Sequence, residues 1–224
     1  RGTSPKVWNA WKGKLLEDLY KLTVRTLGGR APDPGAVIES RKRQALIQLA
    51  LASEPQDSHK RLWDTLEVSY FMRHDAGEIA WHTRQLARHA VRPVATKTEA
   101  AGAGGASAGT VKTFETIVRA RLSPVGEGLQ VLVYAADQPD LFARSCGYCD
   151  RAGFSILDAK IHTTRNGRAL DTFQIINPLV PDHNREFIGM VEAELPAAVE
   201  SQAPLAPPRL GRVSRRVKSF PIAP

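Results

Sequence analysis

The chain has 224 residues, 42% of them hydrophobic, and a net charge of +8 at pH 7. This length allows one large domain or two small ones, and the apolar content is sufficient for a buried core. No apolar run approaches the length of a bilayer span, and no leader pattern opens the chain, so we expect a cytoplasmic protein without membrane contact. Because the chain opens on Arg1 and ends at Pro224, we also expect a fragment cut at both ends.

The first part of the chain has the pattern of an all-helical segment. Ser4-Pro5 and Asp33-Pro34 are typical helix starts, and Gly28-Gly29 is a typical stop. The first helix should have an apolar face that needs a partner, formed by Trp8, Trp11, Leu15, Leu19 and Leu22. A second helix should run from Asp33 towards Glu54.

Two further helices are expected before residue 90. A short one should carry Leu62, Trp63 and Leu66. Asp75 with Glu78 three residues later is a variant of the capping box, which predicts a fourth helix from about Ala76 to about His89.

Small and polar residues fill positions 95 to 110, so the sequence predicts a flexible linker there. After it, Val118, Ala120 and Leu122 alternate with Arg119 and Arg121, the pattern of a strand. We expect this strand to pair with the one that starts at Leu129, with both arginines facing water.

The next stretch predicts strand, helix, strand and strand in turn. The first strand should bury one face, formed by Leu129, Val131, Val133 and Ala135. Asp137-Gln138-Pro139-Asp140 should open the helix, with the proline in its first turn, and Gly153 should end it in a left-handed conformation. Two strands follow, with Leu157, Ala159 and Ile161 on one face of the first, and Ala169, Phe173 and Ile175, interrupted by Asp171, on one face of the second.

Asn166-Gly167 lies between those two strands, which predicts a hairpin with a type I′ turn. A second helix should start at Asp182 and be closed by Pro196. If residues 212 to 222 add one more strand, the fold is α+β: a helical segment followed by a ferredoxin-like βαββαβ domain.

Several stretches then carry a family resemblance. They are Asp137 to Arg144, Cys146-Gly147-Tyr148, Asp150 to Ala159, Ile161 to Arg165, Trp8 to Lys12, Tyr70 to His74 and Ile79 to His82. Together they resemble the first ACT domain, and the helical segment before it, of bacterial PII-protein uridylyltransferase/uridylyl-removing enzymes. The resemblance implies a helical segment over residues 1–94, a Gly/Ala linker over 95–112, an ACT domain over 113–200, and a connection over 201–224 to a second ACT domain.

The resemblance also implies a function for the parent enzyme. Its nucleotidyltransferase domain would transfer UMP to the PII protein, and its hydrolase domain would remove it, both with Mg²⁺ or Mn²⁺, while glutamine favours removal. This stretch has no catalytic constellation and no metal set of its own. His74-Asp75 is better explained by helix capping than by the hydrolase motif, and His82 and His89 are a weak ligand set.

The resemblance implies that this stretch senses glutamine and helps to report it to the catalytic domains. The catalytic domains and the second ACT domain are its expected partners within the same chain. The candidate effector residues are Asp137, Gln138, Pro139, Asp140, Leu141, Ser155 and Ile156. A helix N-terminus can receive an amino acid's carboxylate, and a side-chain carboxylate its ammonium. Asp140 stands where ACT domains usually have glycine, and Ser155 where they usually have asparagine, so binding of the ligand to the second ACT domain is an alternative. Helix capping alone would also explain Asp137 and Asp140, so capping and ligand binding remain alternatives for this loop.

Other interpretations of the sequence stay open. Cys146 and Cys149 form a Cys-x-x-Cys, but they lie well inside the predicted helix, so packing thiols are expected rather than a redox or zinc site. The chain could be the ACT tail of another amino-acid-controlled enzyme. A basic nucleic-acid-binding module is a further alternative, although few aromatics interleave the basic residues and nucleic acid is not the expected partner.

Overall fold

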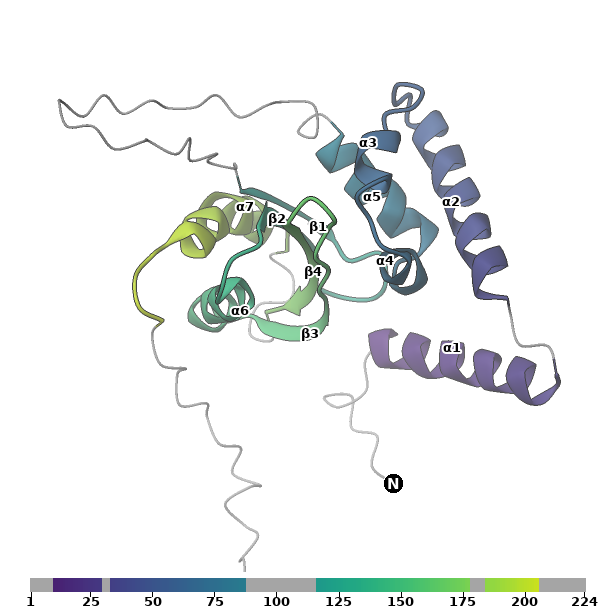
Figure 1. Ribbon diagram of the computed structural model, residues 1–224. Coiled ribbons are helices and arrows are strands. Elements are labelled where there is room, and N and C mark those ends of the chain that lie inside the picture. Colours follow the sequence, from purple (N-terminus) through teal and green to yellow (C-terminus); the bar gives the residue numbers. More distant parts are fainter. Residues whose placement is uncertain (1–9, 30–32, 88–115, 178–183, 206–224) are drawn as a thin grey trace, which may run out of the picture.

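The computed structural model describes residues 10–29, 33–87, 116–177 and 184–205 (Figure 1). Its N-terminal helices are α1 (Ala10–Leu27), α2 (Pro34–Leu51), α3 (Lys60–Trp63), α4 (Val68–Arg73) and α5 (Ala76–Leu86). The following elements are β1 (Ile117–Leu122), β2 (Leu129–Ala136), α6 (Leu141–Arg151), β3 (Ser155–Lys160), β4 (Arg168–Ile176) and α7 (Asn184–Glu200).

Helix boundaries follow the capping signals in the sequence. Asp33 caps α2 through the amides of Gly35 and Ala36, and Pro34 occupies its first position. The capping box of α5 is complete, because Asp75 accepts from the Glu78 amide at 2.8 Å and Glu78 accepts from the Asp75 amide at 3.0 Å. No capping signal of this kind precedes α4, which was not predicted.

The four strands form one antiparallel sheet in the order β1-β2-β4-β3. With α6 and α7 this gives the α+β, ferredoxin-like arrangement of an ACT domain. The described elements follow the order ββαββα, and β1 occupies the sheet edge beside β2, its expected partner. The stretch 212–222, expected to add the last strand, lies outside the described residues.

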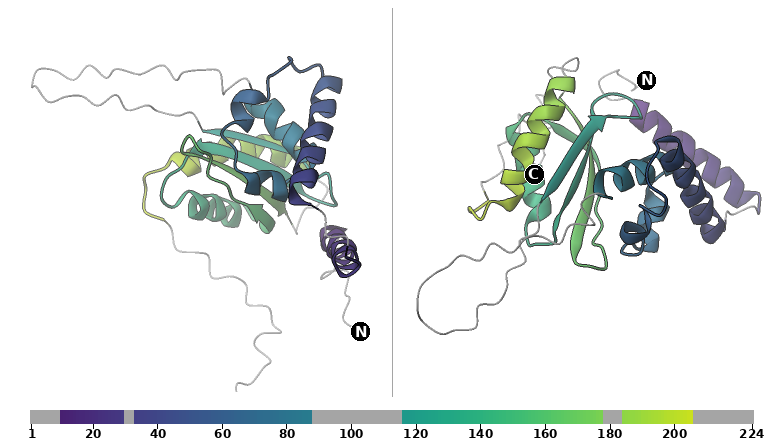
Figure 2. Two further views of the ribbon diagram at one scale, coloured as in Figure 1. Left: turned by 45° about the vertical axis from the view of Figure 1, so that its right-hand side comes forward. Right: turned by 90° about the horizontal axis from the view of Figure 1, so that it is seen from above.

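Both faces of the sheet are buried, whereas the sequence predicted one. Val131, Val133 and Ala135 of β2 face α6 and α7. Leu132 and Tyr134 point the other way, into a core built with residues of α2, α4 and α5. Figure 2 shows the sheet nearly edge-on, with α7 on one side and the N-terminal helices on the other. In this article, residues 34–86 (α2 to α5) are called the helical segment.

The position of the Arg121 side chain is a consequence of that packing. This side chain does not face water as predicted, because its guanidinium lies 4.2 Å from the ring centroid of Trp81 and donates two hydrogen bonds to Gln130 Oε1, at 2.8 and 2.6 Å. Strand β1 does pair with β2 as expected, from Ile117 opposite Tyr134 to Leu122 opposite Leu129.

The β3–β4 hairpin forms, but its turn is of another type. Among Arg165, Asn166 and Gly167, only Gly167 has a positive φ, of 72°, and its amide bonds to Thr164 O at 2.9 Å. A type I′ turn needs positive φ at both central residues, so the predicted type is wrong. A bulge between Ile156 and Asp158 also shifts β3, so that Ile156 and Ala159 pack on the core while Leu157 does not belong to it.

Helix α7 continues through Pro196 to Glu200, so the expected stop at that proline is wrong. Val191, Leu195 and Val199 lie four residues apart and are fully buried against the sheet, and this apolar stripe extends past the proline. At the end of α6, Gly153 has a φ of 79° and the Phe154 amide bonds to Cys149 O at 2.8 Å, as expected for a glycine-terminated helix.

Some predictions fall outside the described residues. These are the linker at 95–112, the connection from residue 206 onward, Ser4-Pro5, Trp8, His89 and Asp182. Helix α1 is described, and its Leu15, Leu19 and Leu22 are about half exposed, at 53%, 55% and 50%. The partner expected for this apolar face is therefore not among the described elements.

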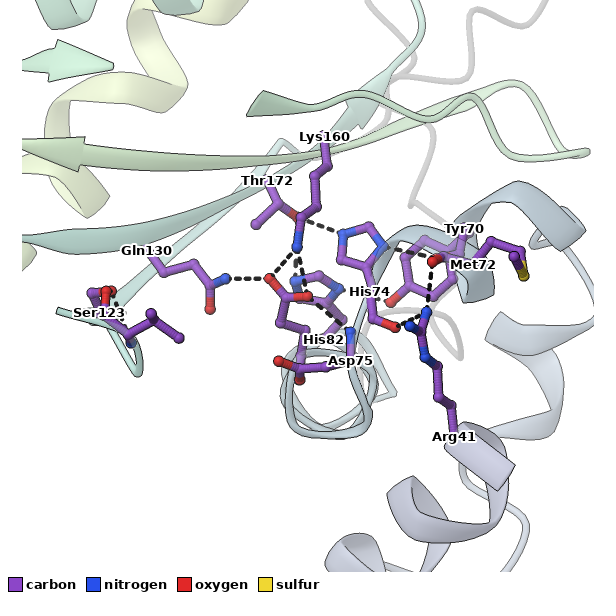
Figure 3. A network of polar contacts seen from close by, with 12 residues as sticks. Arg41, Tyr70, Met72, His74, Asp75, His82, Ser123, Gln130, Lys160 and Thr172 are labelled. Carbon is purple, nitrogen blue, oxygen red and sulfur yellow. Dashed lines mark hydrogen bonds and ion pairs between the residues drawn. The ribbon is translucent and has the colours of Figure 1, made fainter. Parts of the chain in front are cut away.

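A polar network joins the helical segment to the sheet, and Figure 3 shows Gln130, Lys160 and Thr172 of the sheet next to Asp75 and His82. Glu78 is the centre of this network. Lys160 Nζ of β3 lies 2.7 Å from both oxygens of the Glu78 carboxylate. Gln130 Nε2 of β2 donates to the same carboxylate at 2.6 Å. Because Glu78 is only 5% exposed, these partners and the Asp75 amide satisfy a charge that would be costly to bury alone.

We predict that Lys160→Ala lowers the free energy of unfolding by about 2–4 kcal/mol, because it leaves a buried carboxylate without its counter-charge. The matched control is Lys60→Ala, whose pair with Asp57 is exposed on both sides and should contribute less than about 1 kcal/mol. Urea unfolding followed by circular dichroism measures both variants. Equal losses would contradict the structural role of the Glu78 network.

Candidate functional site

The loop predicted to bind an effector opens onto a cavity of about 310 Å³ between the start of α6 and the sheet. Four of the seven predicted residues line it, namely Asp137, Gln138, Asp140 and Leu141. The other lining residues are Phe142, Ala143, Ile161, Thr163, Ala169 and Asp171. We call this cavity the effector pocket. Its volume is at the lower end of the range for small-ligand sites.

Hydrogen bonds hold the loop that follows β2. The Asp137 amide donates to Gly167 O at 3.2 Å, and the Thr163 hydroxyl donates to the Asp137 carboxylate at 3.1 Å. Gln138 Nε2 donates to Val199 O of α7 at 2.8 Å. The loop is thus fixed to the β3–β4 connection on one side and to α7 on the other.

Asp140 precedes α6 in a left-handed conformation, with φ of 66° and ψ of 3°. Glycine favours this backbone region, so an aspartate stands here at a position whose conformation suits glycine. Its side chain makes no capping hydrogen bond, which is contrary to the capping alternative. Pro139 lies in the preceding turn, not in the first helical turn as expected. The first amides of α6 are therefore not capped by Asp140 and can serve a ligand.

Asp171 is the functional candidate that the sequence analysis missed. It lies on β4 opposite Val133, on the face covered by α6 and α7, and is 1% exposed. Its Oδ1 accepts from the His162 amide at 3.4 Å, while Oδ2 is buried without a hydrogen-bond partner among the described residues. The signal was present in the sequence, because Asp171 interrupts the apolar alternation of its strand.

The charged side chains that line the pocket are all acidic. Burial raises the pKa of the Asp171 carboxyl to about 7, the His162 amide opposes this shift, and the nearby Asp137 charge adds to it. Asp137, Asp140 and Asp171 line the pocket, whereas no lysine or arginine among the described residues does. The site therefore favours an ammonium group, and it is unfavourable for a ligand with net negative charge.

Ser155 and Ile156 do not join the other predicted site residues. Ile156 pairs with Ile175, and Ile175 pairs with Leu129 at the start of β2, whereas Asp137 follows the end of that strand. The length of β2 separates the two places by roughly 20 Å. Within one copy of the chain these two residues cannot contact a ligand in the effector pocket.

A second cavity, of about 420 Å³, lies at the seam between the helical segment and the sheet. It is lined by Glu78 and Lys160, which pair with each other, and by further charged groups of both signs such as Arg73, Asp75 and Asp158. The mixture of charges does not select a ligand class.

The remaining candidates have structural roles. Cys149 is buried in the core under α6, where burial raises the pKa of its thiol to about 12, and burial also raises the pKa of the half-buried Cys146. Asp75 caps α5, as predicted. His82 is fully buried and its Nδ1 lies 2.7 Å from the Tyr70 hydroxyl. Across the described ranges, no group of three or more His, Cys, Asp or Glu side chains is arranged to hold a metal ion.

Comparison with known proteins gives the family. Residues 33–85, which span α2 to α5, match the family model described as "Uridylyltransferase GlnD fifth domain". The whole chain aligns with curated proteins named "Bifunctional uridylyltransferase/uridylyl-removing enzyme": it is 51% identical to the one from Ralstonia nicotianae and 49% identical to the one from Cupriavidus pinatubonensis. The chain belongs to this bifunctional uridylyltransferase/uridylyl-removing enzyme family.

The chain spans about a quarter of these relatives, because the alignments cover 100% of it and 24% of each of them. No solved structure matches this member of the uridylyltransferase family. None of the helices in the described ranges is both long and apolar enough to cross a membrane.

Asp171 gives a pH-dependent prediction. Its pKa is higher in the folded chain than its ordinary value, so the folded state holds the proton longer and stability falls as the pH rises from about 4 to about 7. Asp171→Asn removes this loss, which is at most about 4 kcal/mol.

The measurement is urea unfolding of Asp171→Asn and the unchanged chain at pH 4 and pH 8. We expect similar stabilities at pH 4 and a more stable variant at pH 8. Burial lowers the pKa of His74 to about 3 and that of His162 to about 4, which acts in the opposite direction, so the comparison is made at each pH. A variant that is less stable at pH 8 would contradict an ionised, unpartnered Asp171.

Proposed function

We propose that this chain is the glutamine-sensing, regulatory part of an enzyme that attaches UMP to the PII nitrogen-signalling protein and removes it. Membership of the family supports the link to uridylylation. In this proposal the chain consists of an N-terminal helical region (1–94) that contains the helical segment, a linker (95–112), an ACT domain (113–200) and a connection (201–224) to a second ACT domain. Such an enzyme would act in the cytoplasm.

The observation that carries the sensing role is the buried, unpartnered oxygen of Asp171 in a pocket at a helix N-terminus. A free amino acid has an ammonium and a carboxylate on one carbon. Asp171 and Asp137 offer negative charge for the ammonium, and the uncapped first turn of α6 offers amides for the carboxylate. Both halves of the amino acid therefore find a complementary partner.

Among the described residues, three aspartates and no lysine or arginine line the pocket, which favours glutamine over glutamate. Both ligands have the same ammonium and carboxylate, but glutamate adds a second negative charge among three aspartates. Repulsion between the side-chain carboxylate of glutamate and these aspartates disfavours binding. The side-chain amide of glutamine is neutral and can form hydrogen bonds with polar groups such as Gln138. The pocket is therefore expected to select glutamine over glutamate.

The site in the proposal comprises Asp137, Gln138, Pro139, Asp140 and Leu141, with Asp171 and Thr163 added. The Mg²⁺ or Mn²⁺ ions required by uridylyl transfer and removal would belong to the catalytic parts of the parent enzyme. The described residues bring no ligand set together for them, so we assign no step through a metal to this chain.

Nucleic-acid binding through the sheet is not supported. A ferredoxin-like sheet binds RNA through an exposed face with aromatic side chains. Here one face is covered by α6 and α7 and the other by the helical segment.

We predict that calorimetry of the chain with glutamine at pH 8 gives saturable binding, and that glutamate binds at least tenfold more weakly. Asp171→Ala should abolish binding, because it removes the ammonium partner, whereas Asp158→Ala, on the opposite face of the sheet, should leave it unchanged. Glutamine should also bind more tightly at pH 8 than at pH 6, since burial raises the pKa of Asp171 to about 7 and the ionised form is the one that binds. No heat at millimolar glutamine would remove this site.

A further inference from the structure

One short connection touches both the effector pocket and the helical segment. Residues 161–167 join β3 to β4, and within them Ile161 and Thr163 line the pocket. The intervening His162 is 8% exposed and faces the helices instead. Alternate residues of one segment therefore face different parts of the molecule.

Three hydrogen bonds tie the connection to the pocket. The Thr163 hydroxyl donates to the Asp137 carboxylate at 3.1 Å, and Gly167 O accepts from the Asp137 amide at 3.2 Å. The His162 amide donates to Asp171 Oδ1 at 3.4 Å. Both carboxylates that we assign to the ligand's ammonium are thus partners of this segment.

Other contacts tie the same connection to the helical segment. The Arg165 amide donates to Thr65 O at 2.8 Å, and its guanidinium forms an ion pair with Glu67 at 2.8 Å. The ring centroid of His162 lies 5.4 Å from that of Tyr70 and 5.1 Å from that of His74. Tyr70 lies in α4, and Glu67 and His74 are the residues at its two ends. The connection therefore contacts α4, the helix between α3 and the capped start of α5.

The connection is too well braced to absorb a displacement inside itself. The Thr164 amide donates to Arg168 O at 2.7 Å, the Gly167 amide donates to Thr164 O at 2.9 Å, and the Thr164 hydroxyl bonds to Arg168 O at 2.8 Å. A shift at Thr163 or at the His162 amide is therefore passed on to the rings and to Arg165, because packed elements move as units.

We propose that residues 161–167 transmit occupancy of the effector pocket to α4, with His162 and Arg165 as the positioning residues on the helix side. This proposal rests on the proposed sensing function. A bound ammonium stabilises the ionised form of Asp171, and a charged acceptor strengthens and shortens the hydrogen bond from the His162 amide. The ring of His162 then shifts against Tyr70 and His74, and α4 responds.

The first test needs no ligand and uses NMR of the histidine ring protons in the 224-residue chain. Thr163→Val removes the hydroxyl that holds Asp137, and the hydrogen bond of this hydroxyl is made to the pocket side of the connection. We expect the ring signals of both His162 and His74 to shift. Thr23→Val, which removes a hydroxyl bond within exposed α1, is the control and should leave both unchanged. An unchanged His74 signal would overturn the transmission route.

The second test adds glutamine and follows hydrogen exchange of the α4 amides. In the unchanged chain, glutamine should alter their exchange rates. Arg165→Ala should keep glutamine affinity within about threefold but reduce the α4 response by at least half. The control is Arg84→Ala, which loses an ion pair with Glu54 inside the helical segment. A full α4 response in Arg165→Ala, or no response in the unchanged chain despite binding, would contradict the proposal.

The two tests separate this inference from the proposed function. If glutamine does not bind the unchanged chain, the sensing function fails, while the histidine signals of Thr163→Val still decide whether the pocket and α4 are coupled. If glutamine binds but α4 does not respond, sensing stands and transmission through residues 161–167 fails.

Discussion

The arrangement of the helical segment on the sheet depends on the contacts of the Glu78 carboxylate. This carboxylate completes the capping box that starts α5, and it also binds Lys160 of β3 and Gln130 of β2. One side chain thus fixes where a helix begins and where that helix meets the sheet. Around it Leu132, Tyr134 and Leu170 of the sheet are buried by the helical segment, each large side chain contributing roughly 1.5–3 kcal/mol. The apolar contacts supply the stability, and the buried ion pair sets the register.

This joint bears directly on the sensing role that we propose. A sheet with one free face could report a ligand only through its edges or loops, whereas here the sheet and the helical segment share a core. A change at the start of α6 has a short path to α4, because the β3–β4 connection contacts both places. The coupling free energy needed for regulation is small, about 1–3 kcal/mol, which is comparable to a few of the hydrogen bonds that hold residues 161–167.

Much of the fold could be predicted from local signals. Asp33-Pro34, Asp75 with Glu78, and Gly153 act on their nearest neighbours, and each one set an element boundary correctly. Two of the failures depend on distant contacts: the second buried face of β2 needs the helical segment, and α7 runs through Pro196 because Val199 is buried. In the candidate site, the loop at Asp137 could be found from sequence, but Asp171 enters the pocket only through strand pairing, and the distance of Ser155 follows from the sheet register.

The central claim is that the helical segment and the sheet form one cooperative unit, and the most direct measurement compares their unfolding in urea. Trp63 and Trp81 lie in α3 and α5, so their fluorescence follows the helical segment, while NMR signals of β2 and β4 amides follow the sheet. The account predicts the same urea midpoint for both probes, as expected for a two-state transition. Two separate midpoints, with the sheet still folded after the tryptophan signal has changed, would contradict it.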